Sequence, residues 1–316
     1  MKLKFDTETG WLIGGTMVLL VIASLIGWIL SRREGSPSYH SAIANLNART
    51  RAWWIMVAVF LVAMLTGGIG SLILFGLMSF FALREFITMT PTRPADHRTL
   101  FWLFFIVTPI QYWLIGINWY GFFAIFIPVC AFLFVPFRSA LTGDCDHFLE
   151  RTAKIQWALM ACVYCVSHAP ALLILPIPGY EGQNGKLLFY LVLVAQLSDV
   201  FQYVWGKTLG RHKIAPHVSP NKTWEGFIGG IATATALGAG LWWATPFTPW
   251  QSAGMAFVIT LMGFAGGLVM SAIKRDRGVK DYGSMIEGHG GVMDRIDSIC
   301  FSAPIFFHLT HYYFVP

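Results

Sequence analysis

The sequence predicts an all-α polytopic integral membrane protein with about ten transmembrane helices, and its composition carries that prediction. Of the 316 residues, 56% are hydrophobic and 12% are charged, against roughly 25% charged in an ordinary soluble domain. So few charged side chains could not cover the surface of a soluble protein. The composition therefore excludes a soluble globular enzyme, a disordered chain and a secreted disulfide scaffold.

Ten apolar stretches account for the predicted helices, because a hydrocarbon core of about 30 Å requires roughly 20 apolar residues per helix. The second and third stretches are short and meet at Thr66–Gly70, which predicts a tight hairpin or a less regular pair. No repeat and no flexible linker divides the chain, so we expect a single integral membrane domain over residues 1–316. The stretches lie near residues 11–30, 53–66, 69–83, 100–116, 118–136, 156–177, 187–205, 226–244, 252–273 and 298–315.

The distribution of Lys and Arg predicts the orientation, since these residues accumulate in cytoplasmic loops. With ten spans, the loops on one side hold 19 of the 22 basic residues, and the other side keeps only Lys2, Lys4 and Lys186. This asymmetry predicts that the rich loops are cytoplasmic and that both termini lie outside. It also accounts for the net charge of +6 without a nucleic-acid partner.

The first apolar stretch resembles a secretory signal, because Lys2 and Lys4 precede it. Arg32 and Arg33 follow it directly, however, and no small-residue cleavage site is visible. We therefore expect a retained helix.

The predicted loop between Ser271 and Asp297 combines groups that suit a site for phosphate and a metal ion. Basic side chains neutralise phosphate oxygens, carboxylates hold Mg²⁺, and glycines let backbone N–H groups approach an anion. Asp294 and Asp297 are three residues apart and would share one face of a helix. The alternative is a loop of solvated ion pairs in which glycines only form turns. The residues concerned are Lys274, Arg275, Arg277, Lys280, Arg295, Asp276, Asp281, Asp294, Asp297 and the turn Gly288–Gly291.

A second polar segment, Ser219–Gly226, precedes a predicted helix start. Hydroxyl, amide and ammonium groups at that position can bind phosphate at the positive end of a helix. On these residues alone, an ordinary N-cap is the better interpretation. Asp199 lies within the apolar run 187–205, where an ionisable group is costly and indicates function, unless its side chain reaches the membrane interface.

Both segments resemble the signatures of the phosphatidate cytidylyltransferase (CDP-diacylglycerol synthase) family. The segment between Ser271 and Asp297 carries S-x-x-K-R, K-D-x-G and H-G-G-x-x-D-R-x-D, and the segment from Asp199 to Gly226 carries the family's other pattern. The resemblance is strong from about residue 190 onwards, and over 1–185 it is only a pattern of apolar spans. Two positions depart from the family: Glu287 stands where Pro or Gly is usual, and Gly267 stands where a metal-binding Asp is usual. Another carboxylate such as Asp199, Asp276 or Asp281 could compensate, or metal binding could be weaker, or the chemistry could differ.

The resemblance implies transfer of CMP from CTP to phosphatidic acid, giving CDP-diacylglycerol and pyrophosphate. It implies an integral protein of a bacterial inner membrane with its active site on the cytoplasmic side, and leaves a homodimer open. It assigns residues 186–316 to a catalytic region with motif loops 206–225 and 274–297, and leaves the helices of 1–185 without a role. The implied residues are Lys274, Arg275, Lys280, His289 and Arg295 for catalysis; Ser219, Asn221, Lys222, Thr223, Ser271, Gly290 and Gly291 for substrate binding; and Asp294, Asp297, Asp199 and Asp281 for Mg²⁺ or another divalent cation.

Three other functions are compatible with the sequence. Nucleotidyl or phosphoryl transfer to a different lipid phosphate would use the same groups. A catalytically silent homologue is compatible with Gly267. A transporter is less well supported, because the ionisable residues in the spans are mainly Asp199, His168, His308 and His311 and no internal symmetry is visible.

The charge asymmetry makes a testable prediction about topology. We expect residues 206–225 and 274–297 to face the cytoplasm and both termini to face outward. Single cysteines introduced into either loop, after replacement of the five native cysteines, should resist a membrane-impermeant thiol reagent in intact cells. Labelling of either loop from outside would overturn this topology.

Overall fold

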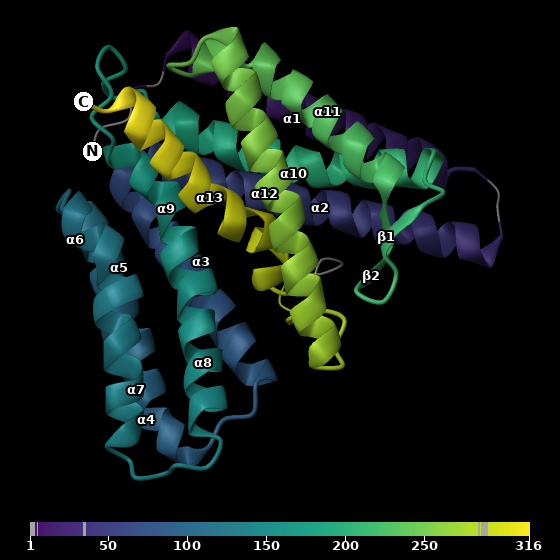
Figure 1. Cartoon of the computed structure of the whole chain (residues 1–316). Helices are drawn as coiled ribbons and strands as arrows, with labels where there is room; N and C mark the ends of the chain where they lie inside the picture. The colour runs from purple at the N-terminus through teal and green to yellow at the C-terminus, as the bar shows by residue number, and fades with distance from the viewer. Residues whose placement is uncertain (1–3, 5, 34–35, 284, 286–289) are drawn as a thin grey trace.

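The computed structural model describes the chain except for residues 1–3, 5, 34–35, 284 and 286–289. Helices dominate it, and the described residues contain one small sheet of two strands. The two ends of the chain lie close together at the upper left of Figure 1. The hairpin of strands lies on the right, and the lower end of the α12 helix lies in the lower middle of the view, while the ends of α4, α7 and α8 form the bottom.

The helices follow the predicted apolar stretches. Three runs contain a π-helical turn between two α-helical parts, a wider turn with i→i+5 hydrogen bonds. In chain order the elements are α1 (Thr7–Ser31), α2 (Pro37–Leu65), α3 (Gly68–Met89), α4 (His97–Trp102), α5 (Thr108–Gly116), α6 (Tyr120–Ile125), α7 (Phe132–Ala140), α8 (Phe148–Leu159), α9 (Val166–Ala171), α10 (Asn184–Thr208), β1 (Lys213–Ala215), β2 (Ser219–Thr223), α11 (Trp224–Gly240), α12 (Pro249–Asp276) and α13 (Met293–Phe314).

The membrane class predicted from composition is confirmed. Within the described ranges, eight helical segments are long and apolar enough to cross a membrane. The other two predicted spans, 226–244 and 298–315, fall on α11 and α13: α11 has 17 residues, and α13 begins with three charged residues among its first five. The figure of ten spans stays a prediction, as does the side on which the termini lie.

The second and third spans form a tight hairpin. Both are full-length helices, because α2 begins at Pro37, well before the apolar stretch at 53–66. Only Thr66 and Gly67 separate α2 from α3, and Gly67 has a positive φ of 83°, a conformation that glycine adopts without strain. Of the two arrangements predicted for Thr66–Gly70, the structure therefore shows the tight hairpin.

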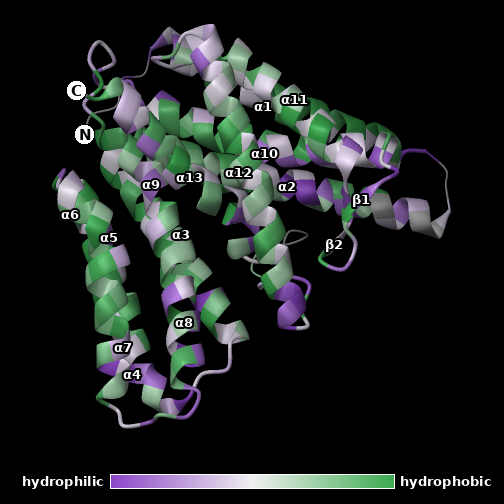
Figure 2. Ribbon diagram, viewed as in Figure 1, coloured by the Kyte–Doolittle hydropathy of each residue, from purple (hydrophilic) through white to green (hydrophobic). Residues whose placement is uncertain are grey.

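One continuous apolar core joins the two halves of the chain. Phe75 and Leu83 of α3, Leu187 of α10, and Ile296 and Phe306 of α13 are all essentially inaccessible to solvent. The outward faces of the helices are apolar as well, and Figure 2 shows hydrophobic residues along the middles of the helices and hydrophilic ones gathered at the hairpin and the lower ends. This pattern is that of helices surrounded by lipid.

The helix α1 is held to the rest of the protein by a buried lysine. Lys186 at the start of α10 is 2% exposed, and its Nζ donates to Asp6 Oδ2 at 2.6 Å and also to Glu8. Asp6 is the N-cap of α1 and accepts from the backbone N–H of Thr9. The α1 helix therefore has a specific polar attachment to α10, and its retention stays a prediction.

Replacing Lys186 tests this attachment. Lys186→Met should cost about 1.5–3 kcal/mol, the range for a hydrogen bond to a charged group, and should lower the Tm in detergent. The matched control Lys154→Met removes an exposed pair with Glu150 and should change the Tm little.

The pH dependence of this difference follows from the pKa of Asp6. Partial burial alone would raise the pKa of Asp6, but hydrogen bonds from Lys186 and Thr9 outweigh it and lower this pKa to about 2. A lowered pKa means stabilisation that is present above the ordinary value of 3.8 and is lost as the pH falls towards 2. The Tm difference between wild type and Lys186→Met should shrink over that range. Equal Tm values at pH 7 would contradict the assignment.

Candidate active site

The β1–β2 hairpin contains the start of the polar segment Ser219–Gly226. Its strands pair antiparallel, with Lys213 opposite Thr223 and Ala215 opposite Ser219. The Glu225 carboxylate accepts from the backbone N–H groups of Arg211 and His212 and so fixes the base of the hairpin. This arrangement holds Lys222 at a fixed distance from the start of α11.

In the structure, Thr223 serves as a helix cap. It was expected to bind substrate, but its side chain is 3% exposed and its hydroxyl accepts from the N–H of Gly226 at 3.1 Å. Thr223 is the N-cap of α11, the ordinary interpretation that its position before a helix also allowed.

The two motif segments meet, although residues 227–270 of the chain separate them. Arg275 at the end of α12 donates from Nε to the carbonyl of Val218 in the hairpin, at 3.3 Å, and from Nη1 to the carbonyl of Val279, at 3.1 Å. Lys222 reaches α12 from the other side: its Nζ lies 3.2 Å from the position that a Cβ at Gly267 would occupy. The prediction that both segments contribute to one site agrees with these contacts.

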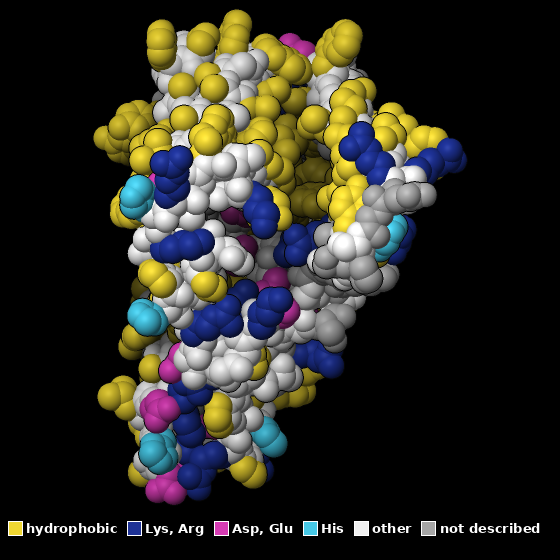
Figure 3. Space-filling view, turned by 90° about the vertical axis from the view of Figure 1, so that its right-hand side faces the viewer, with side chains coloured by type: hydrophobic (Ala, Val, Ile, Leu, Met, Phe, Trp, Pro, Cys, Tyr) yellow, Lys and Arg dark blue, Asp and Glu magenta, His cyan; other side chains and the backbone are white. Residues whose placement is uncertain are grey.

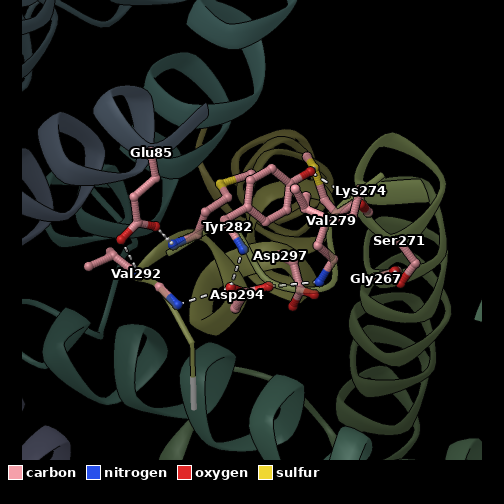
Figure 4. Close-up of polar contacts among 12 residues, drawn as sticks. Glu85, Gly267, Ser271, Lys274, Val279, Tyr282, Val292, Asp294 and Asp297 are labelled. Atoms are coloured by element: carbon pink, nitrogen blue, oxygen red, sulfur yellow. Dashed lines mark hydrogen bonds and ion pairs between the residues drawn. The ribbon is translucent and has the colours of Figure 1, made fainter. Parts of the chain in front are cut away.

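Asp294 lies at the centre of a hydrogen-bond network (Figure 4). Its Oδ1 accepts from Lys274 Nζ at 2.7 Å, and its Oδ2 accepts from the backbone N–H groups of Tyr282 and Gly291 at 2.8 and 2.9 Å. Its side chain is 5% exposed. Both carboxylate oxygens of Asp294, which the resemblance assigns to a metal ion, are thus engaged with the protein.

The glycines of this loop approach carboxylates of the protein itself. Gly290 has a positive φ of 81°, and a Cβ on it would lie 2.7 Å from Asp294 Oδ2. Gly291 donates its N–H to the same oxygen. The two glycines were expected to bring backbone N–H groups to a substrate phosphate, and the structure shows the Gly291 N–H bound within the protein instead.

Glu85 is a site residue that the sequence analysis missed. It comes from α3, in the half of the chain without an assigned role, and its carboxylate accepts from the N–H groups of Val292 at 3.0 Å and Met293 at 2.9 Å (Figure 4). It is 7% exposed. The sequence offered one signal, because Glu85 is an acidic residue just after the apolar stretch 69–83. Its neighbour Arg84 was attributed to membrane topology alone.

Asp199 and Asp297 form a different kind of site, which we call the carboxylate pair. Asp199 projects from α10 and Asp297 from α13, close enough for their charges to interact with each other and with Lys222 and Arg295. Asp297 Oδ1 accepts from the N–H of Ser298 at 2.8 Å. Among the described residues, neither Asp199 nor Asp297 forms an ion pair within 4.0 Å, and Asp199 also interacts with the side chain of Ser298.

Lys222 is the cation that faces the carboxylate pair. Burial lowers the pKa of Lys222, and the negative charges of Asp199 and Asp297 act against that shift. Its Nζ also lies 4.3 Å from the centre of the Phe264 ring, a favourable cation–π distance. The ammonium is therefore held beside the carboxylates.

The donor set of the carboxylate pair fits a hard divalent cation. Mg²⁺ is typically bound through one or two carboxylates, with water and substrate phosphates completing its shell. Within the described residues, no group of three or more His, Cys, Asp or Glu side chains could hold a metal alone. Among the described residues, Arg295 Nε is buried near the pair without a hydrogen-bond partner, which also indicates an incomplete polar site.

The remaining expected residues differ in their surroundings. Ser271 donates its hydroxyl to the carbonyl of Gly267 at 2.6 Å within α12. Ser219 is half-buried, and Asn221, Lys280 and Asp281 are exposed at the site's edge. The backbone carbonyl of Arg295 accepts from Gln196 of α10 at 2.9 Å. His289 lies outside the described residues.

Figure 3 shows the face of the molecule that carries the hairpin. Lys and Arg side chains border a hollow in this face, acidic side chains lie within it, and hydrophobic side chains line the part above. A basic rim around a recessed polar site concentrates polyanions. The apolar wall beside it suits a molecule that is partly in the lipid.

Fold and site together define a membrane-embedded enzyme for phosphorylated substrates. The chain belongs to the cytidylyltransferase family, to which residues 47–313 match, and it is a nucleotidyltransferase of that family. It is 38% identical over 302 residues to the uncharacterized protein YnbB of Escherichia coli, covering 93% of this chain and 95% of that protein. It is 29% identical to a phosphatidate cytidylyltransferase of Staphylococcus aureus, covering 82% and 97% of the two chains. It is 39% identical over 171 residues to one of Mycobacterium leprae, covering 53% of each.

The different surroundings of Asp294 and Asp297 predict different mutant behaviour. Asp294→Asn should lower both the Tm and CTP-dependent turnover, because an amide nitrogen cannot accept the bonds that Asp294 now receives; the loss of stability should be about 1.5–3 kcal/mol. Asp297→Asn should keep the wild-type Tm, because the Asn Oδ1 still accepts from Ser298, yet turnover should fall by orders of magnitude.

Thermal unfolding in detergent and nucleotide-transfer assays on the same preparations check this pair. Near-normal turnover of a folded Asp297→Asn protein would mean that Asp297 is only an ion-pair partner of Arg295.

Proposed function

We propose that the protein transfers CMP from CTP to phosphatidic acid, giving CDP-diacylglycerol and pyrophosphate for phospholipid synthesis. The observation that carries the proposal is the carboxylate pair beside Lys222, within a basic hollow whose neighbouring wall is apolar. The relatives from Staphylococcus aureus and Mycobacterium leprae, both named phosphatidate cytidylyltransferase, support the same reaction.

The chemistry requires little acid–base assistance. The oxygen of the lipid phosphate attacks the α-phosphorus of CTP, and the bond to the departing pyrophosphate breaks. A phosphomonoester has its second pKa near 6 and is largely a dianion at neutral pH, so the nucleophile needs no catalytic base. The protein must bring two polyanions together and stabilise the charge on the leaving group.

The cationic residues supply those two needs. Lys222 lies on the hairpin and Arg295 lies on α13, and the charges of both interact with the carboxylate pair. Lys274 is bound to Asp294 and interacts with the charge of Asp297 one helical turn further. In the proposed reaction, Lys222 and Arg295 bind phosphate oxygens, and Lys274 holds Asp294 and the loop in place.

Asp199 and Asp297 would hold Mg²⁺ in this scheme. When bound, the ion supplies charge neutralisation and orientation of the triphosphate. Asp294, whose oxygens are engaged by Lys274 and two backbone amides, is left with a structural role in this proposal. We place the site on the cytoplasmic side of a bacterial inner membrane, where CTP and the lipid can both reach it.

Gly267 shapes the metal side of this site. A Cβ at Gly267 would lie 3.2 Å from Lys222 Nζ and 3.8 Å from Asp297 Oδ2, so a side chain there would point into the carboxylate pair. The nearest atom is the end of a flexible lysine, which can move by a few tenths of an ångström. The position can therefore accept an aspartate.

Gly267→Asp should lower the Mg²⁺ concentration needed for half-maximal rate, because it adds a carboxylate oxygen where water would otherwise complete the shell. Gly267→Asn is the matched control, since it adds the same volume without charge. A Mg²⁺ titration of both monodisperse proteins decides the point. An unchanged Mg²⁺ dependence in a stable Gly267→Asp protein would reject a gap in the coordination shell at this position.

Incubation of the purified protein with CTP labelled at the α-phosphate, Mg²⁺ and vesicles tests the reaction. Vesicles with phosphatidic acid should yield a labelled lipid that co-migrates with CDP-diacylglycerol, and omission of phosphatidic acid should abolish it. A parallel arm with other lipid phosphates covers a different acceptor, which the YnbB likeness leaves open. Label that enters lipid only with another acceptor, or not at all, would refute the proposal.

A further inference from the structure

We propose that Glu85 is a positioning residue of the active site: from α3 it holds the N-terminus of α13 and thereby sets the places of Asp294 and Asp297. This inference rests on the proposed function only for its effect on turnover. It gives the N-terminal half of the chain a specific part in the site.

The first argument is that α13 has no N-cap of its own. The first N–H groups of a helix lack intrahelical partners and need an acceptor. The residue at the N-cap position is Val292, which has no side-chain oxygen, and no side-chain cap bond is made from it. The two Glu85 oxygens accept from Val292 and Met293 instead, at 3.0 and 2.9 Å. A negative charge at this end of the helix is also favourable to the helix dipole.

The second argument is that the loop is shaped around this carboxylate. A Cβ on Gly283 would lie 2.8 Å from Glu85 Oε1, and one on Gly291 would overlap with Oε2. Two glycines of the motif thus leave room for a side chain that lies some 200 residues away in sequence. Glu85 is 7% exposed, and its oxygens are bound to amides, so it does not reach a substrate.

The third argument is that the cap connects to the groups of the site. Gly291 and Tyr282 donate to Asp294, and Asp294 binds Lys274, so the residues flanking Val292 and Met293 belong to one network. Asp297 follows on the same helix. A shift in the start of α13 would move Asp297 relative to Asp199 on α10, and misplacement of about 1 Å can cost a hundredfold in rate.

The test compares Glu85→Gln and Glu85→Asp with a control on the same helix. Glu85→Gln keeps one acceptor and places an NH₂ group against the second amide, whereas Glu85→Asp keeps both oxygens and the charge on a shorter arm. The control Ser79→Ala removes a buried hydrogen bond to Tyr112 that does not touch the loop. Each full-length protein is studied in detergent.

Residue-resolved amide hydrogen exchange is the first readout, and it does not depend on activity. In Glu85→Gln, faster exchange is expected at Val292 and Met293 and also at Tyr282 and Gly291, whose acceptor is Asp294. Ser79→Ala should leave all four amides unchanged. Acceleration confined to Val292 and Met293 would overturn the proposal, because Glu85 would then be a local cap only. If Glu85→Gln does not fold, Glu85→Asp gives the same comparison.

CMP transfer to phosphatidic acid is the second readout. Glu85→Gln should lower turnover by about tenfold to a hundredfold while its Tm falls no further than that of Ser79→Ala, and Glu85→Asp should recover part of the rate. Wild-type turnover in a folded Glu85→Gln protein would refute the positioning role. If the wild type itself makes no CDP-diacylglycerol, the proposed function fails, and the exchange pattern alone decides the role of Glu85.

Discussion

Two carboxylates from different helices satisfy the N-terminus of α13, and the candidate active site lies around that contact. Glu85 accepts from Val292 and Met293, and Asp294 folds back to accept from Gly291. A helix start buried in an apolar bundle must satisfy its free N–H groups, because water is not available to do so. The same acceptors also fix the loop that carries the motif. The hydrogen bonds that satisfy the helix start therefore also position the candidate catalytic groups.

The acidic residues of the site then divide into two kinds by what they already bind. Asp294 and Glu85 have their oxygens filled by protein donors, which suits groups that hold a structure. Asp199 and Asp297 form no ion pair among the described residues and lie near Lys222, which suits groups that receive a ligand. Like charges held close together are unfavourable in a low dielectric unless cations compensate them. The basic hairpin on one side and Arg295 on the other supply that compensation and leave the pair able to take a divalent ion with its nucleotide.

The sequence predicted the membrane class, the positions of the helices and the polar segments that meet, because these depend on local composition and on spacing within a segment. Apolar length alone placed α10 and α12, and the motif alone paired Lys274 with the loop that contains Asp294. It did not predict Glu85, since a contact between α3 and residue 292 leaves no periodic signal in one sequence. For Thr223, an N-cap was the better interpretation of the residues alone, and the structure shows that cap. For Gly291, a glycine near an anion does not reveal whether the anion is a substrate or a side chain.

The central claim is that Asp199 and Asp297 bind the metal and its nucleotide while Asp294 stays bound within the protein. The most direct test is an experimental structure of the protein with Mn²⁺ and a non-hydrolysable CTP analogue, with Mn²⁺ located by its anomalous scattering. We expect the anomalous peak between Asp199 and Asp297, with the triphosphate against Lys222 and the bond from Lys274 to Asp294 intact. A peak on Asp294 with Lys274 displaced from it would contradict the account.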